Sequence, residues 1–270
     1  GMSNLYTLII HFYHLLIRIS ALFVPKAKLW VKGRKNIFQH IRQSVDNHKP
    51  LVWFHCASLG EFEQGRPVME AFRKAFPDYR ILLTFFSPSG YEVRKNYEGA
   101  DYIFYLPVDT KRNARRFVAY TRPQAAIFVK YEFWFNYLNE LKKGGIPVLS
   151  ISAIFRPGQR FFKKSAWWQR KKLRSIDHFF VQNETSKQLL KTIGINHVTV
   201  SGDTRFDRVH AVAQEKKAFP LIEKFRDGNR LFLAGSTWPR DEELVFSLIK
   251  KNPDLKFIFA PHEVHTSRIS

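Results

Sequence analysis

Cysteine is almost missing from this chain of 270 residues, in which Cys56 is the single example. One thiol excludes an intrachain disulfide and any metal site built from clustered cysteines. The ten histidines show no His-Glu-x-x-His spacing or similar ligand arrangement, so we expect no metal site and no cofactor. Cys56 itself is expected as a small buried residue, and the neighbouring His55 as a packed or hydrogen-bonded one.

Acidic residues are also scarce. The chain has 23 Asp and Glu against 44 Lys and Arg, which gives a formal net charge of +21. Such an excess favours a polyanion or an anionic membrane surface as partner. The usual nucleic-acid-binding motifs and a regular basic recognition helix are both absent. We therefore predict a phosphorylated lipid in an anionic membrane as partner, and no nucleic acid. Charge-driven binding of nucleic acid is kept as the lesser alternative.

The longest apolar run covers residues 5–24 and is near the length that spans a membrane. It is interrupted by polar residues, and the four-residue steps from Tyr6 through Ile10 and His14 to Arg18 predict a polar stripe on a helix that Pro25 stops. No basic region precedes the run and no small-residue cleavage site follows it, so a signal peptide is not expected. A basic skirt follows, formed by Lys26, Lys28, Lys32, Arg34 and Lys35.

These features predict a membrane-associated region over residues 2–36, on the cytoplasmic side because of its lysines and arginine. A helix lying in the interface and a helix spanning the bilayer remain equally open. An amphipathic helix packed on the domain is the structural alternative.

From residue 51 the sequence alternates short apolar runs with segments of helical period. This alternation predicts an α/β fold with a doubly wound, Rossmann-like parallel sheet over residues 37–208. The expected strands are 51–54, 80–85, 102–106, 125–129, 148–152, 178–181 and 198–201. The expected helices are 62–76, one that ends at 97, 110–120, 134–143 and 184–193.

The pattern restarts after residue 209 with a linking helix, a strand at 231–233, a small-residue turn at Gly235, Ser236 and Thr237, a helix at 242–251 and a strand at 256–259. Residues 209–270 thus predict a linker and the start of a second Rossmann-like domain, too short to be complete. Small residues between a strand and a helix let backbone N–H groups face a phosphate.

Two acids follow predicted strands. Glu61 comes after an apolar strand and a small-residue turn that contains Gly60, a residue able to adopt unusual backbone angles and admit a ligand closely. Glu132 comes after the strand at 125–129. Glu61 is either a first-turn acid that stabilises the helix dipole or a general base at the carboxyl edge of the sheet. Glu132 either pairs with a base such as Lys130 or converges with Glu61 on one crevice.

Residues 155–174 alternate cations with large aromatic side chains, which suits an anionic headgroup set in an apolar layer. A solvated charged face is the alternative. The cations are Arg156, Arg160, Lys163, Lys164, Arg170, Lys171, Lys172 and Arg174, and the aromatics are Phe155, Phe161, Phe162, Trp167 and Trp168.

Five segments in order resemble the bacterial 3-deoxy-D-manno-octulosonic acid (Kdo) transferases of lipopolysaccharide synthesis. The segment 58–61, Ser-Leu-Gly-Glu, is similar to the Ser-x-Gly-Glu motif of that family, and 131–134, Tyr-Glu-Phe-Trp, to its Thr-Glu-Leu-Trp motif. The segment 201–207 resembles Gly-Asn-x-Lys-Phe-Asp, 235–237 matches Gly-Ser-Thr, and 260–262 resembles Ala-Pro-Arg-His. Tyr131, Arg205 and His262 depart from the usual Thr, Lys and Arg, and the first two keep a hydroxyl and a cation.

The resemblance implies a GT-B type, inverting glycosyltransferase at the cytoplasmic face of the inner membrane. It implies that Kdo moves from CMP-Kdo to a phosphorylated lipid A precursor, with no metal. The first domain binds the acceptor and the second binds the nucleotide sugar. It also implies that this chain is truncated within the second domain and inactive alone. A non-catalytic fragment that binds anionic lipid is the alternative.

The resemblance also assigns roles. Glu61 is the base, Glu132 stabilises the transition state, and Arg205 offsets negative charge on the Kdo carboxylate or leaving phosphate. A carboxylate beside a turn serves as base if its pKa rises toward neutrality. The expected donor-binding residues are Gly235, Ser236, Thr237, Pro261 and His262. The expected acceptor or membrane residues are Ser58, Gly60, Arg156, Arg160, Lys163 and Lys164.

Overall fold

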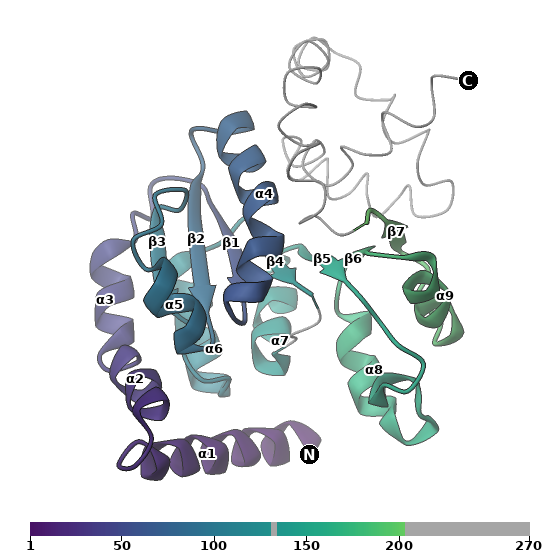
Figure 1. The fold of residues 1–270 in the computed structure, drawn as a ribbon, viewed down its shortest axis with the longest axis horizontal. Helices are drawn as coiled ribbons and strands as arrows, with labels where there is room; N and C mark the ends of the chain where they lie inside the picture. The colour runs from purple at the N-terminus through teal and green to yellow at the C-terminus, as the bar shows by residue number, and fades with distance from the viewer. Residues whose placement is uncertain (131–133, 203–270) are drawn as a thin grey trace.

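A parallel sheet of seven strands forms the centre of the computed structural model, which describes residues 1–130 and 134–202 (Figure 1). The strand order is β3-β2-β1-β4-β5-β6-β7, and every neighbouring pair is parallel. This confirms the predicted doubly wound sheet. The strands are β1 Leu51–Cys56, β2 Arg80–Phe85, β3 Tyr102–Tyr105, β4 Ala125–Val129, β5 Val148–Ala153, β6 His178–Val181 and β7 Val198–Val200.

The central strands β1 and β4 are apolar except for His55, because helices cover both faces of the sheet. All six residues of β1 and all five of β4 are buried. α4 and α5 pack on one face, and α3, α6, α7, α8 and α9 on the other. The helices are α1 Met2–Ser20, α2 Pro25–Gly33, α3 Ile37–Ser44, α4 Leu59–Ala75, α5 Pro88–Arg94, α6 Lys111–Thr121, α7 Phe135–Lys143, α8 Trp167–Arg174 and α9 Glu184–Thr192, with short 3₁₀ turns at Arg160–Phe162 and Lys164–Ala166.

The strand order reverses between β1 and β4. The chain proceeds from β1 to β2 and β3 on one side, and then crosses back to place β4 on the other side of β1. Open α/β folds bind ligands at the carboxyl edge beside such a reversal, because the loops after the two strands run in opposite directions there. Glu61 follows β1, and Lys130 follows β4.

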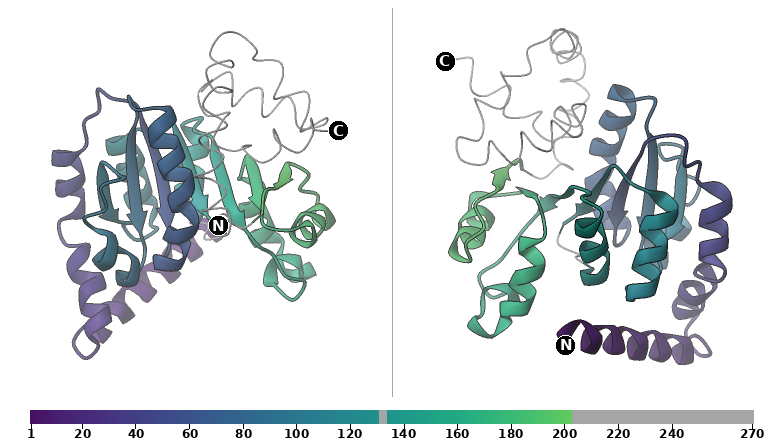
Figure 2. Two further views of the ribbon diagram at one scale, coloured as in Figure 1. Left: turned by 45° about the horizontal axis from the view of Figure 1, so that its top comes forward. Right: turned by 180° about the vertical axis from the view of Figure 1, so that it is seen from behind.

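The helix α1 lies across the carboxyl-edge side of the domain, and the views of Figure 2 leave its outer side uncovered by the described chain. The Tyr6 hydroxyl donates to Asp109 Oδ2 at 2.6 Å, and the Asn136 amide donates to the Thr7 hydroxyl at 3.3 Å. The His14 ring contacts the Trp30 ring at 5.5 Å between centroids. Three residues of the predicted polar stripe, Tyr6, Ile10 and His14, are thus half-buried, while Arg18 is exposed.

The opposite face of α1 is apolar and exposed. Apart from Val93 and Trp167, every exposed large hydrophobic side chain of the described residues lies within residues 2–29. Leu8 is 64% exposed, and Phe12 is 61% exposed. No described helix combines enough length and hydropathy to cross a bilayer. The helix α1 is thus amphipathic and packs on the domain by its polar stripe, as in the structural alternative, and its contact with a membrane stays a prediction.

Pro25 was predicted to stop a helix, but α1 already ends at Ser20 and Pro25 is the first residue of α2. Proline is favoured at the first position of a helix, because an N–H there has no acceptor within the helix. Arg34 also departs from the expected basic skirt. Its guanidinium donates to the carbonyls of Phe86 at 2.7 Å and Leu106 at 2.9 Å, and burial lowers its pKa to about 9. Arg34 thus ties the end of α2 to the ends of β2 and β3.

Candidate active site

Glu61 occupies the first turn of α4, at the carboxyl end of β1. The helix begins at Leu59, three residues earlier than predicted, because Ser58 adopts an extended conformation at the N-cap position. The Ser58 carbonyl accepts the first helical bond from Phe62 N at 3.0 Å. A carboxylate in the first turn is stabilised by the helix dipole. The observed start of α4 thus places Ser58 and Glu61 in the same turn.

The Glu61 carboxylate has two side-chain partners. The Ser58 hydroxyl donates to Oε2, and the Lys130 ammonium lies 3.4 Å from Oε1. The Glu61 side chain keeps 18% of its surface exposed, so a ligand at the sheet edge can reach it. Lys130 is the functional candidate that sequence analysis missed, since it was considered only as a partner for Glu132. Its signal was its place directly after a buried strand that neighbours β1.

Three influences set the protonation of Glu61. Burial is the largest, and it favours the neutral acid. Hydrogen bonds from Ser58 and from the backbone N–H of Glu61, with the charge of Lys130, outweigh burial and lower the pKa of Glu61. Base function was expected to require a pKa raised toward neutrality, and the structure gives the opposite direction. Glu61 is therefore ionised at neutral pH, and its partners limit its basicity.

The backbone of Lys130 adopts a left-handed conformation, with φ of 64°. Such a conformation is unfavourable for a residue with a side chain and persists only where its surroundings fix it. Here Lys130 N donates to the Ile151 carbonyl at 2.8 Å, and the Ser150 hydroxyl donates to the Lys130 carbonyl at 2.7 Å. The adjacent strand β5 thus holds the turn that directs Lys130 toward Glu61.

Gly60 does not have the unusual backbone angles that we expected. It lies within α4, and its φ is not positive. It is exposed, and a Cβ atom placed on it would meet only Ser58 Oγ, at 3.9 Å. Gly60 therefore leaves room beside the Ser58 hydroxyl, and the expected approach of a ligand there stays a prediction.

The turn that carries Ser58 is fixed by the loop after β2. Phe86 N and Ser87 N both donate to the Ala57 carbonyl, at 3.2 and 2.9 Å. A Cβ on Gly90 would lie 3.1 Å from the Ser58 carbonyl carbon, so only glycine fits without displacement. The two loops thus form one rigid edge.

His55 is packed and hydrogen-bonded, as predicted. The Trp134 indole donates to His55 Nε2 at 3.3 Å, and His55 Nδ1 contacts the Thr84 hydroxyl at 2.8 Å. A nitrogen that accepts from an indole carries no proton, so the hydrogen of the neutral ring lies on Nδ1. Trp134 also packs on Phe86, with centroids 4.9 Å apart. Cys56 is buried, as predicted.

Most aromatic side chains of the segment 155–174 pack against the protein and are not exposed to a membrane. Phe155 is buried, and Phe161 and Phe162 pack against the core. Trp167 is 58% exposed, while Trp168 contacts Tyr6 at 5.4 Å between centroids. The cations Arg156, Lys163 and Lys164 are exposed, which leaves their membrane role a prediction.

Among residues 1–130 and 134–202, no group of three or more His, Cys, Asp or Glu side chains has a metal-binding arrangement.

Several predicted site residues lie outside what the structure describes. The predicted residues outside the described backbone or side chains are Glu132, Arg160, Arg205, Gly235, Ser236, Thr237, Pro261 and His262.

The sequence profile of the family described as 3-deoxy-D-manno-octulosonic-acid transferase (kdotransferase) matches residues 32–208. This chain belongs to the Kdo transferase family. Curated Kdo transferases agree: that of Aquifex aeolicus is 27% identical over 233 residues, covering 84% of this chain and 59% of the relative. That of Chlamydia pneumoniae is 32% identical over 207 residues, covering 74% and 45%. The chain thus spans about half the length of the curated Kdo transferases that it matches.

Solved structures with a similar fold include a UDP-GlcNAc 2-epimerase from Neisseria meningitidis bound to UDP-GlcNAc. It has a TM-score of 0.45 and 19% identity, and the match covers 64% of this chain and 52% of that one. A second UDP-N-acetylglucosamine 2-epimerase has a TM-score of 0.46 and 15% identity, and the match covers 60% and 51%.

Proposed function

We propose that this protein transfers Kdo from CMP-Kdo to a phosphorylated lipid A precursor, at the cytoplasmic face of the inner membrane. The observation that carries the proposal is the carboxylate of Glu61, ionised and accessible at the point where the strand order reverses. Family membership supports Kdo as the transferred sugar, and the position of Glu61 supports its role as base.

The proposed reaction is an inverting displacement. The acceptor hydroxyl gives its proton to Glu61, its oxygen bonds to the anomeric carbon of Kdo, and the bond from that carbon to the phosphate of CMP breaks. General-base help of this kind contributes about 10²–10⁴-fold to the rate. Lys130 is placed to pair with an anionic group of a substrate in exchange for Glu61, which would leave Glu61 more basic.

We propose the remaining roles from the resemblance to the family motifs. Glu132 stabilises the transition state, and Arg205 offsets charge on the carboxylate of Kdo or on the leaving phosphate. The donor phosphate contacts Gly235, Ser236 and Thr237, with Pro261 and His262 beside the nucleotide. Ser58, Gly60 and the cations Arg156, Arg160, Lys163 and Lys164 serve the acceptor side.

Membrane contact by α1 is the second proposed function, and it holds with or without catalysis. We propose that α1 lies in the plane of the interface with its polar face on the domain and its apolar face in lipid. Exposed Trp167 extends that surface, because its neighbour Trp168 packs on Tyr6 of α1. Exposed lysines of α2 and the adjoining loop add attraction to anionic lipid, namely Lys26, Lys28, Lys32 and Lys35.

Substitution of Glu61 tests the enzymatic proposal. In the protein at the full length that its gene encodes, Glu61→Gln should lower Kdo transfer by about 10²–10⁴-fold. CMP-Kdo binding should survive, because the amide keeps the shape of the side chain. Glu63→Gln is the matched control on the same helix, where Glu63 pairs with Arg94 at 2.8 Å. Transfer by Glu61→Gln at the level of the control would refute the assignment.

A further inference from the structure

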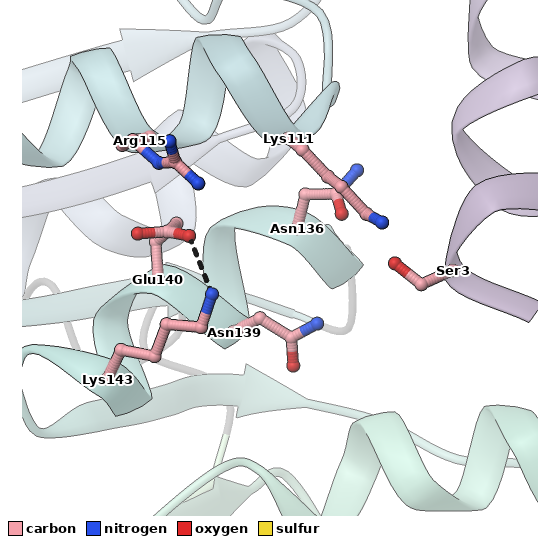
Figure 3. Close-up of a pocket in the computed structure, with 7 residues that line it drawn as sticks. All are labelled: Ser3, Lys111, Arg115, Asn136, Asn139, Glu140 and Lys143. Atoms are coloured by element: carbon pink, nitrogen blue, oxygen red, sulfur yellow. Dashed lines mark hydrogen bonds and ion pairs between the residues drawn. The ribbon is translucent and has the colours of Figure 1, made fainter. Parts of the chain in front are cut away.

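A pocket of about 300 Å³ opens between α1, α6 and α7, and Glu61 is not among its lining residues (Figure 3). α6 contributes Lys111 and Arg115, and α7 contributes Asn139 and Lys143. Ser3 of α1 closes the third side. Figure 3 shows the Lys111 ammonium and the Ser3 hydroxyl directed into the same space. The walls thus come from three separate elements that converge only in the folded protein.

The pocket carries an excess of positive charge. Its single lining carboxylate, that of Glu140, already pairs with Lys143 at 3.2 Å. The Lys111 ammonium donates to the Asn4 amide oxygen at 2.5 Å, and among described residues no carboxylate forms an ion pair with Lys111 or Arg115. Guanidinium and ammonium groups beside amide and hydroxyl donors suit the oxygens of a phosphate.

The pocket adjoins the exposed apolar face of α1. Ser3 faces the pocket, while Leu5 and Leu8, within the next two turns of the helix, are 58% and 64% exposed. A helix in the membrane interface buries its apolar face about 5–10 Å into the boundary between headgroups and acyl chains. Side chains on the domain side of such a helix then lie at the depth of the lipid phosphates.

We propose that this pocket binds the phosphate of an anionic bilayer lipid, as a site separate from the acceptor site beside Glu61. The lipid would fix the protein's orientation on the membrane, since one headgroup would be held between α1 and the domain. The choice of a lipid over free phosphate rests on the proposed interfacial position of α1.

A pair of double variants with equal charge change tests the site. Arg115→Gln/Lys143→Gln removes two pocket cations from α6 and α7. The control, Arg112→Gln/Lys142→Gln, removes two exposed cations from the same helices. Arg112 follows the pocket residue Lys111 in sequence and Lys142 precedes Lys143, but neither lines the pocket. Binding of the whole chain to vesicles of phosphatidylcholine with phosphatidic acid is measured by flotation. The pocket variant should lose at least about tenfold more affinity than the control, because charge-assisted contacts exceed general attraction.

Each outcome decides the proposal. Equal losses in both variants would overturn it, because net charge alone would then explain binding. Vesicles of pure phosphatidylcholine should show no difference between the variants. Inorganic phosphate and glycerol phosphate, titrated by calorimetry, distinguish a free phosphate from a lipid headgroup. Specific binding of either as tight as binding to vesicles would overturn the lipid assignment.

Asn139→Asp places a carboxylate in the pocket without removing a cation. It should repeat the loss of binding if the double variant unfolds, and unchanged binding would overturn the site. Unchanged binding of an α1-face variant such as Leu8→Gln to every vesicle would instead identify failure of the membrane proposal.

Discussion

The carboxylate of Glu61 and the ammonium of Lys130 face each other across 3.4 Å, at the point where the strand order of the sheet reverses. Neither residue is near the other in sequence, and each is held by the turn that ends its own strand. The ion pair therefore depends on the parallel register of β1 and β4, in which His55 lies opposite Phe128.

Removal of Lys130 should make Glu61 a stronger base. The charge of Lys130 helps to lower the pKa of Glu61, so Lys130→Met should raise it. A base must be ionised, so the acid limb of the rate profile for Kdo transfer should move to higher pH in the variant. Titration of the Glu61 carboxyl carbon by NMR measures the pKa directly, without transfer activity.

The matched control for that titration is Lys142→Met, because Lys142 is exposed on α7 and forms no described ion pair with Glu61. It changes the net charge equally. A Glu61 titration that moves as far in Lys142→Met as in Lys130→Met would mean that the ion pair has no particular effect on the base.

Asp109 makes stability depend on pH in a defined window. Burial raises its pKa from 3.8 to about 6, although Tyr6, the backbone N–H groups of Asn136 and Tyr137, and Lys172 oppose the rise. The folded state then holds a proton that the unfolded state has lost, so unfolding free energy falls as pH increases from about 4 to 6, by at most about 3 kcal/mol. Asp109→Asn should lack that dependence, measured by urea unfolding at several pH values.

Asp78→Asn is the control for Asp109, since Asp78 is exposed. The pH slope of this control should equal that of the unsubstituted chain. The same slope in Asp109→Asn would show that Asp109 does not exchange its proton in this window. At neutral pH Asp109→Asn should also be less stable, because one amide oxygen replaces two carboxylate oxygens that accept from Tyr6 and the start of α7.

The sequence predicted those parts of the fold that follow from local apolar pattern. The strands at 80–85, 125–129 and 178–181 have the predicted bounds, because burial on both faces favours a mostly apolar run. The helices α2, α3 and α8 were not predicted. α2 and α8 are rich in lysine or arginine, and Pro25 was taken as an end although it is a favoured first residue.

The sequence located the acid of the candidate site but not its partners. Glu61 was predicted because a strand, a turn and an acid are adjacent in sequence. The bond from Trp134 to His55 joins residues 79 positions apart, and Asp109 supports α7 from a loop 27 positions earlier. No local pattern encodes such contacts, which arise when parallel strands bring their carboxyl ends to one edge.

The apolar face of α1 should determine attachment to bilayers. Leu8→Gln and Phe12→Gln each replace a side chain that is more than half exposed, so the fold should tolerate them. Each should lower partitioning into vesicles about tenfold, because burial of such a side chain contributes about 1.5–3 kcal/mol. Flotation with anionic vesicles measures the effect, and binding should also weaken as salt screens the lysines of α2. Val93→Gln changes an equally exposed side chain on α5 and is the control. If Leu8→Gln and Val93→Gln bind alike, α1 does not lie in the lipid interface, and its apolar face requires another partner.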